Sequence, residues 1–303
     1  MKLRGLFVGV ITIDIQYLVD RFPLSNEKMF ATKCAMTVGG PATNASITFS
    51  YLGGNSRLLT TVGQHSFTSF MESELRHYNV EVTDLSAGVS QLPTVSSIVT
   101  TSGSGDRAVI AAASSLPSNM SEMTFITNQD DYSVVLVDGF NMESCCTVAM
   151  QARQLGIPVV LDAGSWKKGM ERLLPYIDIA ICSEQFQTPN GSDQESIMAY
   201  LADQGVSYRA ITRGERPILY RTPTDNGEIA IEDVEVADTL GAGDILHGAF
   251  CYYYAKDHQF VPALLHASQV ATLSCQTFGT RPWMERGTSY MGGSSSSSSS
   301  KSM

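Results

Sequence analysis

The chain has 303 residues, of which 43% are hydrophobic and 17% are charged, and its formal net charge at pH 7 is -10. This composition excludes a generally disordered protein, and the acidic balance disfavours nucleic acid or an anionic membrane as the main partner. No stretch approaches the roughly 20 apolar residues that would span a bilayer, and the six cysteines include no C-x-x-C pair. These features favour a cytoplasmic protein with reduced thiols.

Short apolar runs alternate with helical patterns along most of the chain. The runs are typical of buried strands, and several helical patterns end at a glycine. This alternation predicts an α/β fold with a mostly parallel sheet, whose ligands bind at the carboxyl ends of the strands. The expected strands are Leu6–Ile13, Ser56–Val62, Ser133–Val137, Val159–Asp162, Ile177–Cys182 and Ala210–Thr212, and the expected helices are Thr43–Leu52, Ser66–Tyr78, Cys145–Leu155 and Ser192–Gln204.

Two stretches, within about residues 15–38 and 94–112, break this rhythm because no helix separates their extended segments. We interpret them as antiparallel strands of a small second sheet that covers the site as a lid, with surface loops as the alternative. We expect one domain over residues 1–290. Residues 291–303 are rich in glycine and serine and predict a flexible tail.

The segment from Asp238 to Asp244 reads DTLGAGD and precedes a helical pattern. Gly241, Ala242 and Gly243 therefore lie at a helix N-terminus, where main-chain N–H groups and the helix dipole favour an anion. A carboxylate beside an anion site suits phosphoryl transfer, in which Asp244 takes a proton from a hydroxyl. The alternative is that Asp244 only stabilises the first helical turn. The loop has no lysine, so it is not a Walker A loop.

DTLGAGD resembles the second signature of the ribokinase-like (PfkB) carbohydrate kinase family. The segment from Gly39 to Ser46, GGPATNAS, resembles the first signature, and the resemblance covers roughly Leu6 to Glu285. The glycine motif and the spacing of the lid look most like the ketohexokinase-like and sulfosugar-kinase-like branch. The resemblance implies a three-layer, doubly wound kinase that uses ATP and Mg²⁺, with K⁺ as a candidate activator. It implies phosphorylation of a sugar hydroxyl, for which we expect a primary one.

The resemblance also implies roles for individual residues. The carboxylate of Asp244 would be the catalytic base, and the main chain of Gly241, Ala242 and Gly243 would form the anion hole. Asp14, at the end of the first expected strand, would hold sugar hydroxyls, because a carboxylate can accept two of them. The other implied substrate-binding residues are Gly39, Gly40, Asn44 and, as a candidate in the lid, Lys28.

On the nucleotide side, Thr212, Arg213 and Gly214 resemble a strand end that lines the phosphates. Arg213 is an added cation that could meet phosphate, with a solvated arginine as the alternative. The implied ATP-binding residues also include Ser183 and Gly279, and Asp238 and Thr239 occupy the position of a candidate monovalent cation site.

The resemblance fails at one motif, an Asn-x-x-Glu that positions magnesium-bound water and phosphate. Here Ser183 stands for the asparagine and Phe186 for the glutamate, while Glu184 is out of register. This loss leaves a non-catalytic sugar- and ATP-binding regulatory protein as an alternative.

A nucleoside kinase on the same fold is a further alternative. Aromatic side chains of the lid that stack on a nucleobase would favour this alternative. Tyr17, Phe22 and Phe30 are the candidates. We also expect a homodimer through the lid, because an exposed sheet edge tends to pair.

Overall fold

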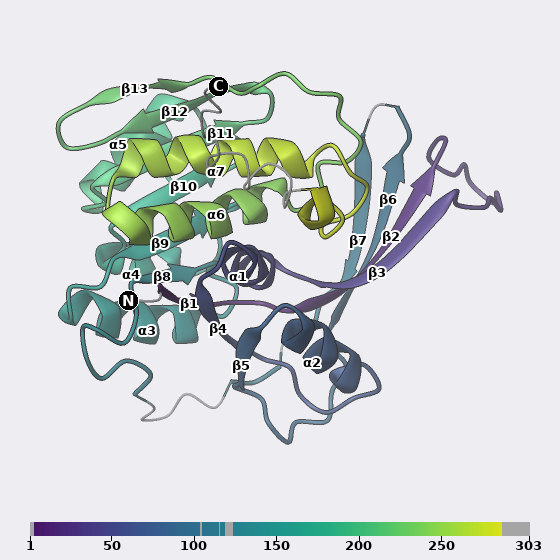
Figure 1. Cartoon of the computed structure of the whole chain (residues 1–303), viewed down its shortest axis with the longest axis horizontal. Helices are drawn as coiled ribbons and strands as arrows, with labels where there is room; N and C mark the ends of the chain where they lie inside the picture. Colours follow the sequence, from purple (N-terminus) through teal and green to yellow (C-terminus); the bar gives the residue numbers. More distant parts are fainter. Residues whose placement is uncertain (1–2, 104, 115, 119–123, 287–303) are drawn as a thin grey trace, which may run out of the picture.

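The computed structural model of the chain describes residues 3–103, 105–114, 116–118 and 124–286, and the expected tail at residues 291–303 lies outside them. Within the described residues, a nine-stranded sheet forms the body of the molecule and a four-stranded sheet projects from one side (Figure 1). None of the described helices combines the length and apolarity needed to cross a bilayer.

The large sheet is parallel from β11 to β5, with two antiparallel strands added at one edge. This confirms the predicted mostly parallel sheet, although β5, β12 and β13 were not predicted as strands. The strands, in spatial order, are β13 (Asn226–Ile229), β12 (Arg216–Arg221), β11 (Tyr208–Arg213), β10 (Ile179–Ser183), β9 (Val159–Ala163), β8 (Val134–Val137), β1 (Arg4–Val8), β4 (Asn55–Thr60) and β5 (Val80–Asp84).

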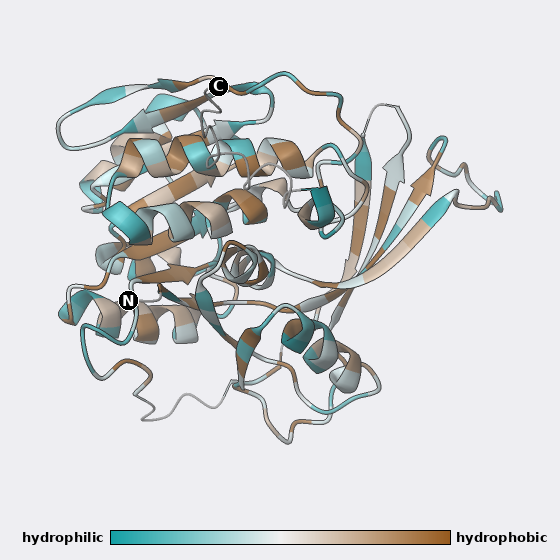
Figure 2. Cartoon of the chain, viewed as in Figure 1, coloured by the Kyte–Doolittle hydropathy of each residue, from teal (hydrophilic) through white to brown (hydrophobic). Residues whose placement is uncertain are grey.

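Helices cover both faces of this sheet, so the molecule has three layers. In β8, Val134 and Leu136 join one hydrophobic core while Val135 and Val137 join the other, because successive side chains of a strand point to opposite faces. Burial on both faces explains why the central strands of this sheet are hydrophobic along their length (Figure 2). One core packs under α1 (Pro41–Tyr51), α2 (Thr68–His77), α6 (Ala242–Asp257) and α7 (Phe260–Ser274), and the other under α3 (Met142–Gln154), α4 (Met170–Leu173), η1 (Leu174–Tyr176) and α5 (Gln194–Asp203).

The smaller sheet consists of two hairpins from the two stretches that lacked a helical pattern. Its order is β3-β2-β6-β7, and both outer pairings are antiparallel while the central pairing of β2 with β6 is parallel. The strands are β2 (Thr12–Val19), β3 (Lys33–Gly39), β6 (Thr94–Thr101) and β7 (Arg107–Ala112).

The prediction of one continuous strand over Leu6–Ile13 was wrong, because the chain leaves the large sheet after Val8 and enters the smaller sheet at Thr12. Asp138, at the end of β8, fixes this crossing by accepting the N–H of Val10 at 2.9 Å. A Cβ on Gly9 would lie 2.0 Å from Asp138 Oδ2, so only glycine fits there. Asp14 consequently lies inside β2 rather than at the end of the first strand.

Helices α1 and α6 pack closely at Gly248. A Cβ at this position would lie 2.3 Å from the carbonyl oxygen of Ala45 and 2.7 Å from Cβ of Thr48. The missing side chain therefore sets the separation of the two helices that carry Asn44 and Asp244.

We predict that Gly248→Ala destabilises the protein by about 1–3 kcal/mol, because the added methyl group overpacks a main-chain contact. In an open helix the same change would stabilise by up to about 1 kcal/mol, so the sign of the effect is diagnostic. Thermal unfolding measures it, and Lys256→Ala at an exposed position of α6 is the control. An increased midpoint in Gly248→Ala would contradict close packing here.

Candidate active site

The first turn of α6 is the centre of the site. Gly241 caps it in the left-handed region, with φ 69°, and a Cβ there would also lie 2.8 Å from Thr280 Cγ2. Ile245 makes the first helical hydrogen bond, donating its N–H to Gly241 O at 2.8 Å. The N–H groups of Gly243 and Asp244 precede that bond and face the space beyond the helix, where they and the dipole favour an anion.

Asp244 is half-buried beside this anion site, and Asn44 Nδ2 donates to its Oδ2 at 2.7 Å. The pKa of Asp244 is raised to about 7, first by burial and then by the negative charge of Asp162, while the bond from Asn44 opposes the rise. A carboxyl group that titrates near neutral pH has the basicity that a general base needs.

A buried histidine supports this turn from below. His247 Nδ1 lies 2.7 Å from Gly243 O and 3.3 Å from Asp162 Oδ2, and its Nε2 lies 3.1 Å from Ile181 O. The side chain thus ties the first turn of α6 to the ends of β9 and β10. Neither His247 nor Asp162 could be assigned a role from the sequence, since neither stands in a loop motif.

Asp14 lies near enough to Asp244 for its negative charge to raise the pKa of that carboxyl group, although the strand that carries Asp14 was predicted incorrectly. Its side chain is 8% exposed, and Thr12 Oγ1 donates to its Oδ1 at 2.7 Å. Burial raises the pKa of Asp14, while the bonds from Thr12 and Ser96 and the charge of Arg281 oppose the rise. A Cβ on Gly39 would lie 1.9 Å from Asp14 Oδ2, so the glycine pair leaves the room that this carboxylate occupies.

Lys28 is not brought to these groups. It lies in the loop between β2 and β3, at the outer end of the smaller sheet (Figure 1), and its Nζ lies 5.6 Å from the centre of the Phe30 ring.

A cleft of about 860 Å³ adjoins the first turn of α6, a volume suited to a nucleotide-sized ligand. Its walls unite the predicted phosphate-lining residues with the predicted anion hole. The lining includes Thr212, Arg213, Gly214, Thr239, Ala242 and Gly243.

Arg213 does not point free into this cleft. Its Nε donates to Pro217 O at 2.6 Å, and its Nη2 lies 3.6 Å from Glu228 Oε1. Only 12% of its side chain is exposed, so Arg213 is not the fully solvated arginine of the alternative, and its contact with phosphate stays a prediction.

The segment at the end of β10, where the family has its Asn-x-x-Glu motif, contains Ser183, Glu184 and Phe186 in this chain. We call this segment the altered corner. Phe186 is fully buried and packs on Trp166, with ring centres 5.8 Å apart. Glu184 lines the cleft and pairs with Arg216, while Ser183 Oγ accepts the N–H of Gln185 at 3.2 Å. No group of three or more potential metal-binding side chains occurs in the described part of the chain.

Asp238 holds the loop before α6 rather than offering a free carboxylate. It accepts hydrogen bonds from Gln16 Nε2 at 2.5 Å, Gly279 N–H at 2.9 Å and Leu240 N–H at 3.0 Å. Gly279, which was predicted to bind ATP, thus donates its main-chain N–H to Asp238. Thr239 Oγ1 accepts from Arg107 of β7 at 2.9 Å, which joins the smaller sheet to this loop.

Known proteins resemble this chain in sequence and in fold. The family model of pfkB family carbohydrate kinases matches residues 4–286. The chain belongs to this family. The ribokinase of Lactococcus lactis is 22% identical over 293 residues, covering 92% of this chain and 93% of its own, and the deoxyribokinase of Salmonella typhi is 21% identical over 308 residues, covering 94% and 97%.

Solved structures of such kinases share the fold. Ribokinase of Arabidopsis thaliana, complexed with ribose and ATP, has a TM-score of 0.73 at 20% identity and covers 94% of this chain and 96% of its own. The nucleoside kinase of Methanocaldococcus jannaschii has a TM-score of 0.71 at 17% identity, with coverage of 93% and 98%.

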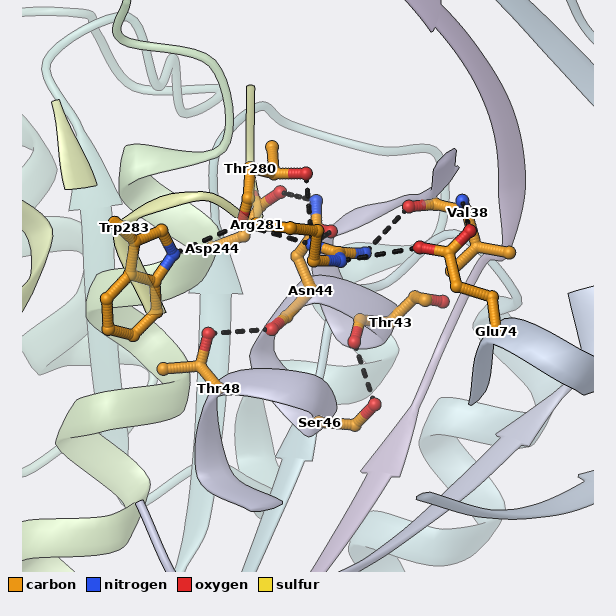
Figure 3. Close-up of polar contacts among 10 residues, drawn as sticks. All are labelled: Val38, Thr43, Asn44, Ser46, Thr48, Glu74, Asp244, Thr280, Arg281 and Trp283. Atoms are coloured by element: carbon orange, nitrogen blue, oxygen red, sulfur yellow. Dashed lines mark hydrogen bonds and ion pairs between the residues drawn. The ribbon is translucent and has the colours of Figure 1, made fainter. Parts of the chain in front are cut away.

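In this pfkB kinase, the described residues include a buried arginine whose role the sequence did not predict. Arg281 is 8% exposed, and its Nη1 donates to Asn44 Oδ1 at 2.9 Å (Figure 3). The available sequence signal was the single charged residue in the largely apolar stretch TFGTRPWM. An arginine in such a stretch is expected to be buried, and a buried arginine requires hydrogen-bond or ion-pair partners.

We predict that Asp244→Asn stabilises the protein at pH 8 and much less at pH 4. The folded-state pKa of Asp244 is raised to about 7, above its unfolded value near 3.9. Ionising this carboxyl therefore costs folding free energy, in part above pH 4 and in full above pH 7. Thermal unfolding of both proteins at pH 4, 6 and 8 measures the difference. A gain independent of pH would show that Asp244 has an ordinary pKa.

Proposed function

We propose that this enzyme transfers the γ-phosphoryl group of ATP to a primary hydroxyl of a sugar or sugar derivative. The observation that carries the proposal is the position of Asp244, whose pKa is raised to about 7 and which directly follows Ala242 and Gly243, the residues of the first turn of α6 that line the cleft. When a hydroxyl attacks a phosphate, the base accepts the proton of the hydroxyl and the anion site stabilises the negative charge of the phosphate.

In the proposed reaction, Asp14 orients the sugar and Asp244 takes the proton of the attacking hydroxyl. Gly243 and the neighbouring main-chain N–H groups stabilise the charge that develops on the transferring phosphoryl oxygens. The smaller sheet closes over the sugar as a lid and excludes water. The contact of Arg107 with Thr239 supports closure, because it joins β7 to the anion loop.

Mg²⁺ is part of the proposal as the ion that neutralises the phosphates. Because Mg²⁺ is usually held by one or two carboxylates plus phosphates and water, the absence of a three-ligand cluster among the described residues agrees with it. Glu184 is the carboxylate of the altered motif that lines the cleft, and we assign it to Mg²⁺-bound water. K⁺ as an activator rests on the resemblance alone.

Sugars are favoured over nucleosides by the position of two of the three candidate aromatic side chains, Phe22 and Phe30. Phe30 is 84% exposed and Phe22 is 39% exposed in the outer loop of the smaller sheet, so neither supplies a stacking surface next to Asp14. A binding-only protein is disfavoured, because a carboxyl with a pKa near 7 in a buried site reduces stability without serving recognition.

We predict that ADP release with MgATP occurs with one class among ketoses, aldoses, sugar acids and nucleosides. In Asp244→Asn, turnover falls by about 10²–10⁴-fold while ATP binding, measured by calorimetry, is retained. Asp203→Asn, an exposed acid of α5, is the matched control and keeps full turnover. Nucleosides as the sole acceptors would favour the nucleoside kinase, and tight sugar binding without product would favour the regulatory protein.

We also propose a homodimer through the smaller sheet. β7 is an edge strand, and each of its residues is exposed, including Val109 at 51% and Ile110 at 75%. An exposed apolar edge strand is a template for pairing with a second chain.

We predict a dimer by sedimentation velocity at micromolar concentration, and a monomer after Ile110→Glu. Leu265→Glu, at an exposed apolar position of α7, is the control and leaves the dimer intact. Sedimentation of the unaltered protein as a monomer would refute the proposed interface.

A further inference from the structure

Arg281 connects the base to the smaller sheet. Its Nη1 donates to Asn44 Oδ1 at 2.9 Å, its Nη2 donates to Val38 O at 2.8 Å, and its Nε lies 3.4 Å from Glu74 Oε1 (Figure 3). Its guanidinium carbon also lies 5.5 Å from the centre of the Tyr78 ring. One buried side chain thus contacts α1, the end of β3, and α2.

We propose that Arg281 is a positioning residue for phosphoryl transfer, which fixes the side-chain amide of Asn44 so that it donates to the base Asp244. This inference rests on the proposed function and adds a residue outside both signature motifs.

The direction of the Asn44 amide follows from the chemistry of its two neighbours. A guanidinium has only donors, so the amide must turn its oxygen towards Arg281. The amide nitrogen then faces Asp244, whose ionised carboxylate can only accept, at 2.7 Å. The reverse orientation would place donors against donors and oxygen against oxygen. Arg281 therefore selects the orientation that stabilises ionised Asp244.

Arg281 is itself held in place. Trp283 is fully buried, its Nε1 donates to Thr280 O at 3.1 Å, and its ring packs edge-on against Tyr51 at 5.0 Å. Tyr51 OH donates to Met284 O at 2.6 Å, which ties the same loop to the end of α1. The loop that carries Arg281 is therefore anchored to the helix that carries Asn44.

The ion pair of Arg281 with Glu74 holds the end of β3, just before the start of α1. Glu74 Oε2 accepts the N–H of Val38 at 2.8 Å, while Arg281 donates to the carbonyl of the same residue. Val38 directly precedes the glycine pair that leads into α1. The strand of the smaller sheet and the amide that contacts the base therefore share one anchor.

Replacing Arg281 alone would leave Glu74 as a buried carboxylate without its cation, which risks unfolding. The test therefore uses the double variant Arg281→Met/Glu74→Gln, which removes both charges and keeps an oxygen for the Val38 N–H. Arg57→Met is the matched control, because Arg57 is a half-buried arginine of β4 that donates to Thr83 and Tyr132.

We predict that the apparent pKa of Asp244 rises by about 1–2 units in the double variant, the effect of one lost hydrogen bond to a charged group. The readout is the pH dependence of the thermal midpoint, compared between each protein and its Asp244→Asn derivative. This readout needs no turnover. The acid limb of kcat shifts by the same amount, kcat at pH 7 falls about 10- to 100-fold, and KM for ATP stays within about twofold.

A double-mutant cycle completes the test. In an Asn44→Ala background the double variant causes no further shift of the Asp244 pKa, since Arg281 acts through that amide. An additive shift, an unshifted pKa, or a raised KM for sugar with unchanged kcat would each overturn the positioning role. Absence of turnover in the unaltered protein would refute the proposed function, while the unfolding measurement would still decide the role of Arg281.

Discussion

The hydrogen bond from Asn44 to Asp244 is the contact on which the site depends. It joins residues 200 positions apart and brings together the two signature motifs, one at the start of α1 and one at the start of α6. The contact requires two helices at close range, which is why Gly248 has no room for a side chain. The three-layer fold serves this requirement, because α1 and α6 pack side by side over the same core, and both begin at the carboxyl edge of the sheet.

The same contact governs the electrostatics. Burial raises the pKa of Asp244 and of Asp14, and burial of Glu74 raises its pKa as well. The charge of Arg281 opposes the rise for Asp14 and Glu74 directly, and for Asp244 it acts through the Asn44 amide. Ionisation of these carboxyl groups thus lowers the stability of the folded protein. The buried guanidinium of Arg281, which stays charged at all working pH values, offsets part of this loss. Stability and reactivity oppose each other here because both depend on the same desolvation.

Local patterns predicted the parts of this site that local geometry determines. Glycines at Gly241 and Gly39 mark a turn and a close approach, and alternating strands and helices mark the sheet, so these could be predicted without knowing what packs against them. The patterns could not give partners that are distant in the chain. Asp14 was placed in the wrong strand because Asp138, at the end of β8, redirects the chain after β1. Arg281 was not assigned a role because its partners come from α1, α2 and β3, and no spacing within its own segment encodes them.

The altered corner at Phe186 bears on whether the chain is a working kinase. Phe186 belongs to the core beneath the sheet, next to Trp166, so a glutamate there would be buried among apolar side chains. The change is therefore a rebuilt piece of core, and it leaves the first turn of α6, the cleft and the contact between Asn44 and Asp244 in place. Among the described residues of this corner, Glu184 still presents a carboxylate to the cleft, held by Arg216. A protein that only bound its ligands would be more stable with a neutral side chain in place of Asp244, whereas the proposed role as a general base calls for a pKa in the range that burial gives this carboxyl group.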